Sequence, residues 1–351
     1  MKVLLIGSHL GYNLEHYLKL ALERMGIEAF FVGFQASLGR LAWPIRVTTS
    51  RFKRSRWIME PFGLRAFNNF IEKTARDIQP ELVLVIKGET VLPSTLKHIS
   101  TATHSKIAIF NPDDPRYFDS LVKDKALLYD HFFTGSEGAL PLYKEAGIDN
   151  VTFVPFACDP SVHRTIRLSD EQNRIFGSPT CFVGAYYPSR GKLLGRLGKF
   201  NLGIWGPYWR ISRVKATIHK PVRGPDLAKV FNASKIIINA HHPDHLDFMT
   251  NMRVFETTGC GSFLLTDRSR GLERHFEIGK EVVCYDSVEE FVELVEYFLT
   301  HDEERMQVAR RGQLRAYRDH TYDNRVRQIL RSLELEPTSR QSTASAQEFI
   351  A

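Results

Sequence analysis

The segment from Asn251 to Asp267, NMRVFETTGCGSFLLTD, places an arginine and a glutamate three residues apart ahead of an apolar strand pattern. Residues three apart are neighbours on a helix, so Arg253 and Glu256 form either a local ion pair or a shared surface for a ligand. A helix that begins near Asn251 directs its first backbone N–H groups at an anion, and Arg253 would reinforce that attraction. Glu256 would then be costly unless it accepted hydrogen bonds from neutral groups such as a ribose diol. The spacing fits a nucleoside diphosphate and a local ion pair equally well.

A second cationic group follows a glycine-containing loop between Gly184 and Lys192. Arg190 can bind a phosphate through two donors, and Lys192 adds a point charge. Cations at the N-terminus of a helix oppose its macrodipole, so their presence there favours an anion between them. Gly184 and Tyr186 belong to the same loop and are predicted to contact the nucleotide. The alternative is a solvated helix start with dispersed charge.

Two further polar clusters suggest metal binding at first sight. In HHPDHLD, residues 241–247, the histidines and aspartates are interrupted by Pro243 and have no distant partner cluster, so we expect a loop at a strand end rather than a zinc site. Asp113 and Asp114 stand between two prolines, which indicate a turn. Asp114 is a candidate base facing an acceptor, and a turn-capping role is the alternative.

The first glycine loop, Gly7-Ser8-His9-Leu10-Gly11, lacks the GxGxxG spacing, and no acidic residue ends the strand that follows its helix. A nicotinamide cofactor is therefore disfavoured. We interpret the loop as a tight strand-to-helix turn below an acceptor pocket.

These residues must be positioned by a chain of 351 residues, a length that suits two domains. KVLLIG, a glycine loop, a periodic helix and a second strand form a βαβ unit, and the same order restarts at TCFVG after residue 180. We predict two Rossmann-like α/β domains, with ligands at the carboxyl ends of the strands. The expected boundaries are an N-terminal acceptor domain at 1–160, a linker at 161–176, a nucleotide-sugar domain at 177–322, a helix at 323–335 and a disordered tail at 336–351.

The composition is that of a globular protein, with 43% hydrophobic and 25% charged residues, and no apolar run reaches the length of a membrane span. The start, MKVLLIG, is interpreted as a first strand rather than a signal peptide. The four scattered cysteines suggest reduced core thiols and a cytoplasmic location. The net charge of +7 favours anionic partners.

Basic and aromatic residues alternate between Arg51 and Trp57, in RFKRSRW. This pattern suits peripheral contact with an anionic membrane, whereas nucleic acid is a disfavoured partner. A solvated loop of the acceptor domain is the alternative. The aromatic residues of WGPYWR, Trp205 to Arg210, could stack on a base or a sugar, or pack in a core.

The chain from Asn251 onward resembles the C-terminal domain of CgeB-like glycosyltransferases of the GT-B fold. The matching positions are Arg253, Phe255-Glu256, Gly261, Thr266-Asp267, Gly271-Leu272, Gly279-Lys280-Glu281 and His320-Thr321-Tyr322. The N-terminal half is similar more loosely, at Lys87-Gly88 and Asp113-Asp114. The resemblance spans most of the chain and is strongest over residues 180–330.

This resemblance implies two doubly wound domains facing across a cleft, a nucleotide-diphosphate sugar donor and a glycan, protein or lipid acceptor. It suggests a UDP-sugar, retention at the anomeric carbon, and no cofactor or metal. Arg190, Lys192 and Arg253 would stabilise the leaving diphosphate. Retaining GT-B enzymes carry two glutamates eight residues apart, and Glu256 matches the second, which binds ribose. Phe248 occupies the place of the first, with Asp247 beside it as the candidate substitute.

Two other functions stay open. A nucleotide-sugar epimerase of the same fold would need an acid and base pair that the sequence does not identify. A non-catalytic protein that binds sugar nucleotides or polysaccharides is favoured by the missing first glutamate.

Overall fold

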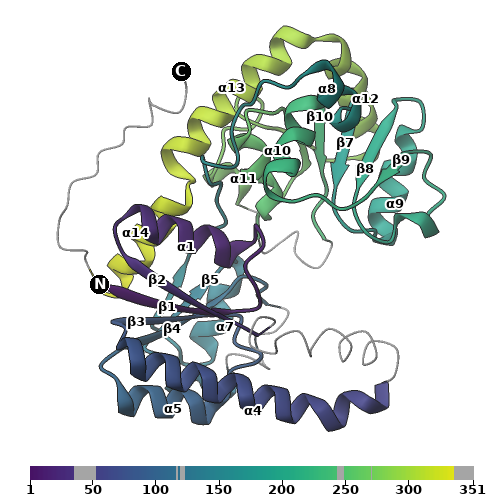
Figure 1. Ribbon diagram of the computed structural model, residues 1–351. Helices are drawn as coiled ribbons and strands as arrows, with labels where there is room; N and C mark the ends of the chain where they lie inside the picture. The colour runs from purple at the N-terminus through teal and green to yellow at the C-terminus, as the bar shows by residue number, and fades with distance from the viewer. Residues whose placement is uncertain (35–52, 116–117, 119–122, 243–248, 270, 336–351) are drawn as a thin grey trace. The chain divides into compact units, whose positions relative to one another are not determined.

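The computed structural model describes residues 1–34, 53–115, 118, 123–242, 249–269 and 271–335, with backbone only for 53–62 (Figure 1). The chain forms two compact units. The first is Met1–Pro155 together with the described chain from Val326 onward, and the second is Phe156–Arg325. Asp247, Arg51, Phe52 and the predicted tail at 336–351 lie outside the described residues.

The first unit is built on a parallel six-stranded sheet in the order β2-β1-β3-β4-β5-β6. Its strands are β1 (Lys2–Gly7), β2 (Glu28–Gly33), β3 (Leu82–Ile86), β4 (Lys106–Asn111), β5 (His131–Thr134) and β6 (Val151–Phe153). Its helical segments are α1 (Leu14–Arg24), α4 (Lys53–Ile78), α5 (Pro93–Ala102), η1 (Lys123–Leu128), η2 (Glu137–Ala139), α7 (Leu140–Glu145) and the part of α14 (Tyr322–Ser332) from Val326 onward.

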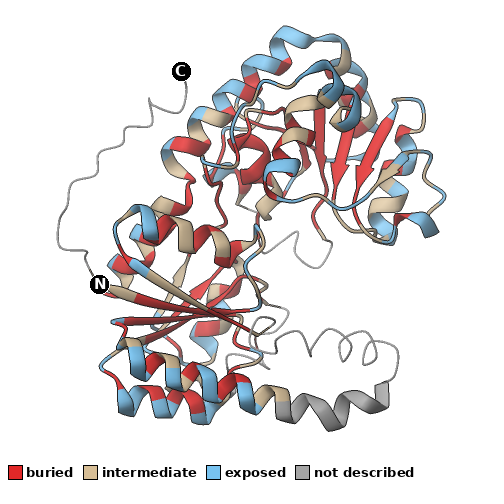
Figure 2. Cartoon of the chain, in the orientation of Figure 1, coloured by how far each residue is buried: buried red, intermediate tan, exposed pale blue. Residues whose placement is uncertain are grey.

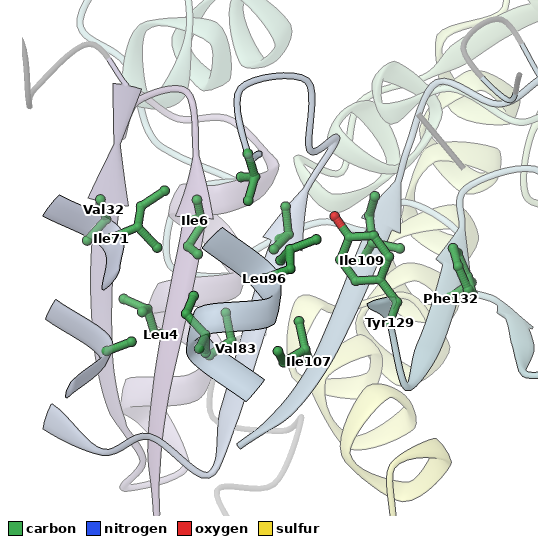
Figure 3. Close-up of a cluster of buried hydrophobic side chains, with 14 of the residues drawn as sticks. Leu4, Ile6, Val32, Ile71, Val83, Leu96, Ile107, Ile109, Tyr129 and Phe132 are labelled. Carbon is green, nitrogen blue, oxygen red and sulfur yellow. The ribbon is translucent and has the colours of Figure 1, made fainter. Parts of the chain in front are cut away.

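The central strands β1, β3 and β4 are buried over nearly their whole length, as expected where helices cover both faces of a parallel sheet. Alternate residues of the central strands turn to one face, where they pack against α4 and α5. Figure 3 shows this cluster, which includes Leu4, Ile6, Val83, Ile107 and Ile109 of the strands with Ile71 and Leu96 of the helices. Its packing fixes the first unit's sheet beneath these helices.

The second unit has its own parallel six-stranded sheet, in the order β12-β11-β10-β7-β8-β9. Its strands are β7 (Thr180–Val183), β8 (Leu202–Trp205), β9 (Thr217–His219), β10 (Ile236–Asn239), β11 (Leu264–Asp267) and β12 (Val283–Tyr285). Its helical segments are α8 (Asp170–Phe176), α9 (Pro188–Leu194), η3 (Gly195–Leu197), η4 (Trp209–Ile211), α10 (Gly224–Ala233), α11 (Met252–Gly259), η6 (Leu272–Arg274), α12 (Val288–Thr300) and α13 (Asp302–Asp319).

Both faces of this second sheet are buried, and Figure 2 shows β7, β8 and β10 as buried throughout. Phe182 and Ile238 pack on the face covered by α12 and α13. Cys181 and Ile237, one residue out of step, pack on the opposite face against Phe231 of α10. The alternation is that of strands in a three-layer α/β unit.

The order of the strands indicates which edge of each sheet is expected to bind a ligand. In the second unit, β7 lies between β8 and β10, so the chain runs outward through β8 and β9 before returning to β10 on the other side. In the first unit, β1 lies between β2 and β3. Ligands of doubly wound sheets bind at the carboxyl ends of the strands where this reversal occurs. The prediction of doubly wound α/β architecture is confirmed, and the cleft between the units stays a prediction.

Several local expectations are refined by the structure. The polar segment expected to link the domains belongs to the second unit and contains α8, which begins with a capping box of Ser169 and Gln172. Residues from Lys53 to Trp57 belong to α4 rather than to a loop. All four cysteines are free and buried, as expected of core thiols. Among the described helices, none combines the length and apolar character that crossing a bilayer requires.

Candidate functional site

Polar side chains meet at the carboxyl edge of β10, β11 and β12. Asn239, the last residue of β10, donates from Nδ2 to Thr266 Oγ1 at 2.9 Å. Asn239 Oδ1 accepts from Asn251 Nδ2 at 3.1 Å, and the Tyr285 hydroxyl donates to the Asn239 carbonyl at 3.1 Å. Each of these residues stands at the end of an apolar strand or the start of α11. Together they anchor the start of α11 to the edge of the sheet.

A buried histidine extends this network. His241 Nδ1 lies 2.6 Å from Asp267 Oδ1, and the side chain of His241 is 0% exposed. The backbone N–H of His241 also donates to both Asp267 oxygens, at 3.1 and 2.9 Å. On its other side, His241 Nε2 accepts from the Asn251 backbone N–H at 3.3 Å. Because a backbone N–H only donates, this contact requires an unprotonated Nε2 and places the proton on Nδ1, toward Asp267.

The start of α11 offers its backbone N–H groups without a side-chain cap. Asn251 is the N-cap residue, has extended backbone angles and makes no side-chain capping bond. No acidic residue lies in the first turn. Asn251 Oδ1 is buried and has no hydrogen-bond partner within the described part of the chain. An uncapped helix start of this kind attracts an anion.

One turn into α11, Glu256 pairs with Arg253, as the local ion-pair alternative expected. The side chain of Glu256 is only 4% exposed, whereas that of Arg253 is 23% exposed and lies over the Phe231 ring at 5.7 Å. The second Glu256 oxygen lies 3.7 Å from His163 Nε2. His163 Nδ1 accepts from the Asp159 backbone N–H, and burial lowers the pKa of His163 despite the nearby carboxylate. Both carboxylate oxygens of Glu256 therefore already face polar groups of the protein.

Arg190 bridges the two strands that separate at the strand-order reversal. Its Nε and Nη2 donate to the Ala240 carbonyl, just after β10, at 3.0 and 2.7 Å. Its Nη1 donates to the Ala185 carbonyl, just after β7, at 3.1 Å. The guanidinium also lies over the Tyr187 ring at 5.0 Å. Burial lowers the pKa of Arg190, with Asp267 acting in the opposite direction and Arg253 in the same one. Arg190 thus has a structural role that the sequence did not predict.

The rest of the β7 loop is held by close packing. Trp209 Nε1 donates to the Gly184 carbonyl at 2.8 Å, and a side chain at Gly206 would place its Cβ 1.8 Å from that oxygen. The Tyr186 ring contacts Trp209 edge-on at 5.2 Å. Lys192 is exposed and lies in the last turn of the short helix α9, so it is not at the helix N-terminus as predicted. Lys192 therefore does not oppose the macrodipole of α9.

The aromatic residues of WGPYWR divide between core and surface. Trp205 and Trp209 are buried, with Trp205 stacked on His219 at 4.2 Å. Tyr208 is 73% exposed, in a left-handed conformation with φ of 67°. Core packing therefore accounts for both tryptophans, and only Tyr208 offers a free ring.

The HHPDHLD segment is described only at its start. His242 contacts the Tyr187 ring edge-on at 4.6 Å, and residues 243–248, including Asp247, fall outside the description. Within the described ranges no cluster of three or more histidine, cysteine, aspartate or glutamate side chains could hold a metal ion. The placement of Asp247 beside the sugar stays a prediction.

In the first unit, Asp114 is buried and accepts hydrogen bonds from its neighbours, so it does not face an acceptor substrate. Its side chain is 0% exposed, and its Oδ2 accepts from the hydroxyls of Thr134 and Tyr143 at 2.6 and 2.8 Å. Its Oδ1 accepts from Asn111 Nδ2. Burial raises the pKa of Asp114 to about 6, against the lowering effect of the two hydroxyls. The predicted base role is therefore corrected to a structural one, because a base must reach the proton it removes.

Asp113, its neighbour, points elsewhere. It pairs with Lys87, which follows β3 in a left-handed conformation with φ of 67°. Both side chains are partly exposed, at 30% for Asp113 and 42% for Lys87. This pair lies at the carboxyl end of β3 and β4, close to the strand-order reversal of the first unit.

Sequence reasoning missed Asn239, Tyr285 and His163 as site residues. The available signal was a polar residue at the end of an apolar strand, as in IIIN and VCYD. His241 and Asp267 were noted only in a metal motif and a family pattern, and their contact joins residues 26 positions apart.

The raised pKa of Asp114 gives a pH-dependent prediction. A buried carboxyl with a pKa near 6, against an ordinary value of 3.8, binds its proton more tightly when folded. Its contribution to stability is therefore present below about pH 4 and is lost as the pH rises toward 6. We expect the difference in unfolding free energy between wild type and Asp114→Asn to fall by about 3 kcal/mol across this window, at about 1.4 kcal/mol per pKa unit.

Urea unfolding at pH 4, 5, 6 and 7 measures this difference. The exposed Asp149→Asn in the same unit is the control and should follow wild type. Parallel pH profiles for wild type and Asp114→Asn would contradict the buried, protonated carboxyl.

Known proteins share both the sequence pattern and the architecture. Residues 190–331 match a family described as glycosyl transferase-like. The chain is 25% identical over 252 residues to spore protein CgeB of Bacillus subtilis (strain 168), covering 66% of this chain and 76% of CgeB.

Two solved structures illustrate the shared fold. Anabaena Alr3699/HepE in complex with UDP-glucose superposes with a TM-score of 0.61 at 12% identity, over 95% of this chain and 99% of HepE. AviGT4, a glycosyltransferase involved in avilamycin A biosynthesis, gives a TM-score of 0.61 at 14% identity, over 95% of this chain and 97% of AviGT4. At these identities the likeness shows the fold. The chain therefore has the GT-B fold, and its sequence is similar to the glycosyl transferase-like family over residues 190–331 and to CgeB.

Proposed function

We propose that the second unit binds a nucleotide-diphosphate sugar, with UDP-sugar as the donor, and that the first unit binds the acceptor. The observation that carries this proposal is the uncapped start of α11 at the carboxyl edge of the sheet, next to the strand-order reversal that Arg190 bridges. Backbone N–H groups, Arg253 and the half-buried Arg190 would then attract a diphosphate at this edge. HepE, which shares the fold, was crystallised with UDP-glucose.

The diphosphate would be held mainly by α11 and Arg253. Arg253 is the more exposed member of its ion pair, so its guanidinium, which now lies over the Phe231 ring, can turn toward a ligand. Arg190 supplies charge from below, through N–H groups not used by the two carbonyls. Lys192 is exposed and free to approach the outer phosphate. Charge that develops on the leaving diphosphate is thereby stabilised without a metal ion.

Glu256 would bind ribose by exchanging partners. When the diphosphate draws Arg253 away, the Glu256 oxygen that now faces Arg253 becomes available to a ribose hydroxyl. The second oxygen keeps its contact with His163. Arg253 keeps an anionic partner throughout this exchange, because it moves from the Glu256 carboxylate to the diphosphate. Nucleotide binding and the opening of this ion pair are therefore coupled.

Retention at the anomeric carbon is proposed from the CgeB resemblance. The exposed Lys87–Asp113 pair at the edge of the first unit is the place we propose for acceptor contact. Glycan, protein and lipid acceptors all stay open.

A nucleotide screen tests the central proposal. Thermal-shift measurements with UDP, GDP, ADP and TDP should raise the melting temperature most with UDP, because a ligand that binds only the folded state stabilises it. Incubation with a panel of UDP-sugars should then release UDP slowly by hydrolysis or faster by transfer. Isomerised sugar without release would indicate an epimerase, and binding without any turnover would indicate a non-catalytic binder. No shift with any nucleotide would contradict the proposal.

Glu256→Gln should weaken the binding of both uridine and UDP by about 1–3 kcal/mol, because a hydrogen bond to a charged acceptor is lost. Isothermal titration measures both affinities. Glu273→Gln, which removes an exposed carboxylate of the same unit, should leave them unchanged. Unchanged uridine affinity in a folded Glu256→Gln would remove the ribose role.

Arg253→Ala should affect UDP far more than uridine, because its guanidinium is proposed to contact phosphate alone. We expect a loss of about tenfold or more for UDP, in the range of a charge-assisted hydrogen bond. Arg311→Ala, exposed on α13, is the control for total charge. Equal losses for uridine and UDP would indicate that Arg253 only supports the fold.

A further inference from the structure

We propose that His241 is a positioning residue for donor binding, acting through Asn251. Its Nε2 holds the backbone N–H of Asn251, and Asp267 fixes the tautomer that makes this contact possible. This inference rests on the proposed function, because it concerns the helix start to which the diphosphate would bind.

The histidine joins three separate elements. It follows β10, its partner Asp267 ends β11, and Asn251 precedes α11. The imidazole is wholly buried, and Asp267 is 20% exposed. The Asp267 carboxylate receives the His241 backbone N–H as well as its ring proton, so the carboxylate orients the ring at two points. A ring fixed in this way presents its Nε2 lone pair in one direction only.

That direction leads to the N-cap of α11. Asn251 is held twice, by His241 at its backbone N–H and by Asn239 at its side-chain amide. With its Nδ2 committed to Asn239, the buried Asn251 Oδ1 has no partner among the described residues. A hydroxyl of the donor would satisfy this oxygen, and the next N–H groups of α11 would face the diphosphate. Because the helix start is already ordered before the ligand binds, less of the binding free energy is lost in ordering it.

A neutral ring is essential to this arrangement. A proton on Nε2 would face the Asn251 N–H, and two donors repel each other. The carboxylate of Asp267 contacts the ring, and Arg190 binds the carbonyl of Ala240, the preceding residue. Asp267 therefore accepts a hydrogen bond from Nδ1–H. This leaves Nε2 without a proton, so it can accept a hydrogen bond from the Asn251 N–H.

Two substitutions at the same position separate the two ring nitrogens. In His241→Asn the short amide reaches only the place of Nδ1, so the contact with Asp267 is kept and the contact with Asn251 is lost. In His241→Gln the longer amide reaches the place of Nε2 and can offer its oxygen to the Asn251 N–H. Val308→Ala, in the core of the same unit, controls for a general loss of stability.

Titration with UDP and with uridine tests the proposal in the full-length protein. We expect His241→Asn to weaken UDP binding by about tenfold and to leave uridine within about twofold, because the helix start acts on the phosphates. His241→Gln should keep UDP affinity within about threefold of wild type, and Val308→Ala should leave it unchanged.

Four results would overturn the inference. These are unchanged UDP affinity in a folded His241→Asn, equal losses for UDP and uridine, a comparable loss in Val308→Ala, and a tenfold loss in His241→Gln. If His241→Asn does not fold by circular dichroism, the glutamine variant decides alone. A wild-type protein that binds none of the four nucleotides would instead contradict the proposed function, and the inference would fall with it.

Discussion

The guanidinium of Arg190 binds the carbonyls that end two neighbouring parallel strands, β7 and β10. These strands part at their carboxyl ends because the chain leaves β7 toward β8 and returns to β10 from the other side. Backbone carbonyls left in this gap need donors, and a planar cation with several N–H groups can serve both strands. The positions of Ala240 and of His241, the next residue, depend on this contact.

His241 in turn fixes the start of α11. The ring connects Asp267 of β11 to Asn251, and Asn239 of β10 holds the side chain of the same asparagine. A buried polar network is stable only when its members find partners, so it favours one arrangement of the strands and the helix over others. Asn251 Oδ1, the buried atom of this network that has no partner among the described residues, lies at the start of α11. The network therefore specifies the fold locally and leaves one acceptor for a ligand.

The two units use the same sheet architecture in different ways. At the edge of the first unit, the Asp114 carboxylate accepts hydrogen bonds from Asn111, Thr134 and Tyr143. Its acceptor atoms are therefore engaged within the protein. At the edge of the second unit, the helix start is uncapped and Arg253 is partly exposed. This difference favours anion binding in the second unit, where we propose the donor site.

The sequence by itself determined the doubly wound class and the strand, glycine loop and helix that begin each half of the chain, because apolar runs and glycine loops report burial and turns locally. It also placed the start of a helix at Asn251, from the polar residues ahead of an apolar strand. It left open whether Glu256 meets Arg253 or a ligand, and whether Asp114 faces an acceptor or caps a turn. Only the tertiary structure decided that Glu256 lies between Arg253 and His163, that Asp114 is buried, and that His241 meets Asp267. These contacts join side chains from separate strands and helices, and their geometry is set by strand order and register, which no local pattern encodes.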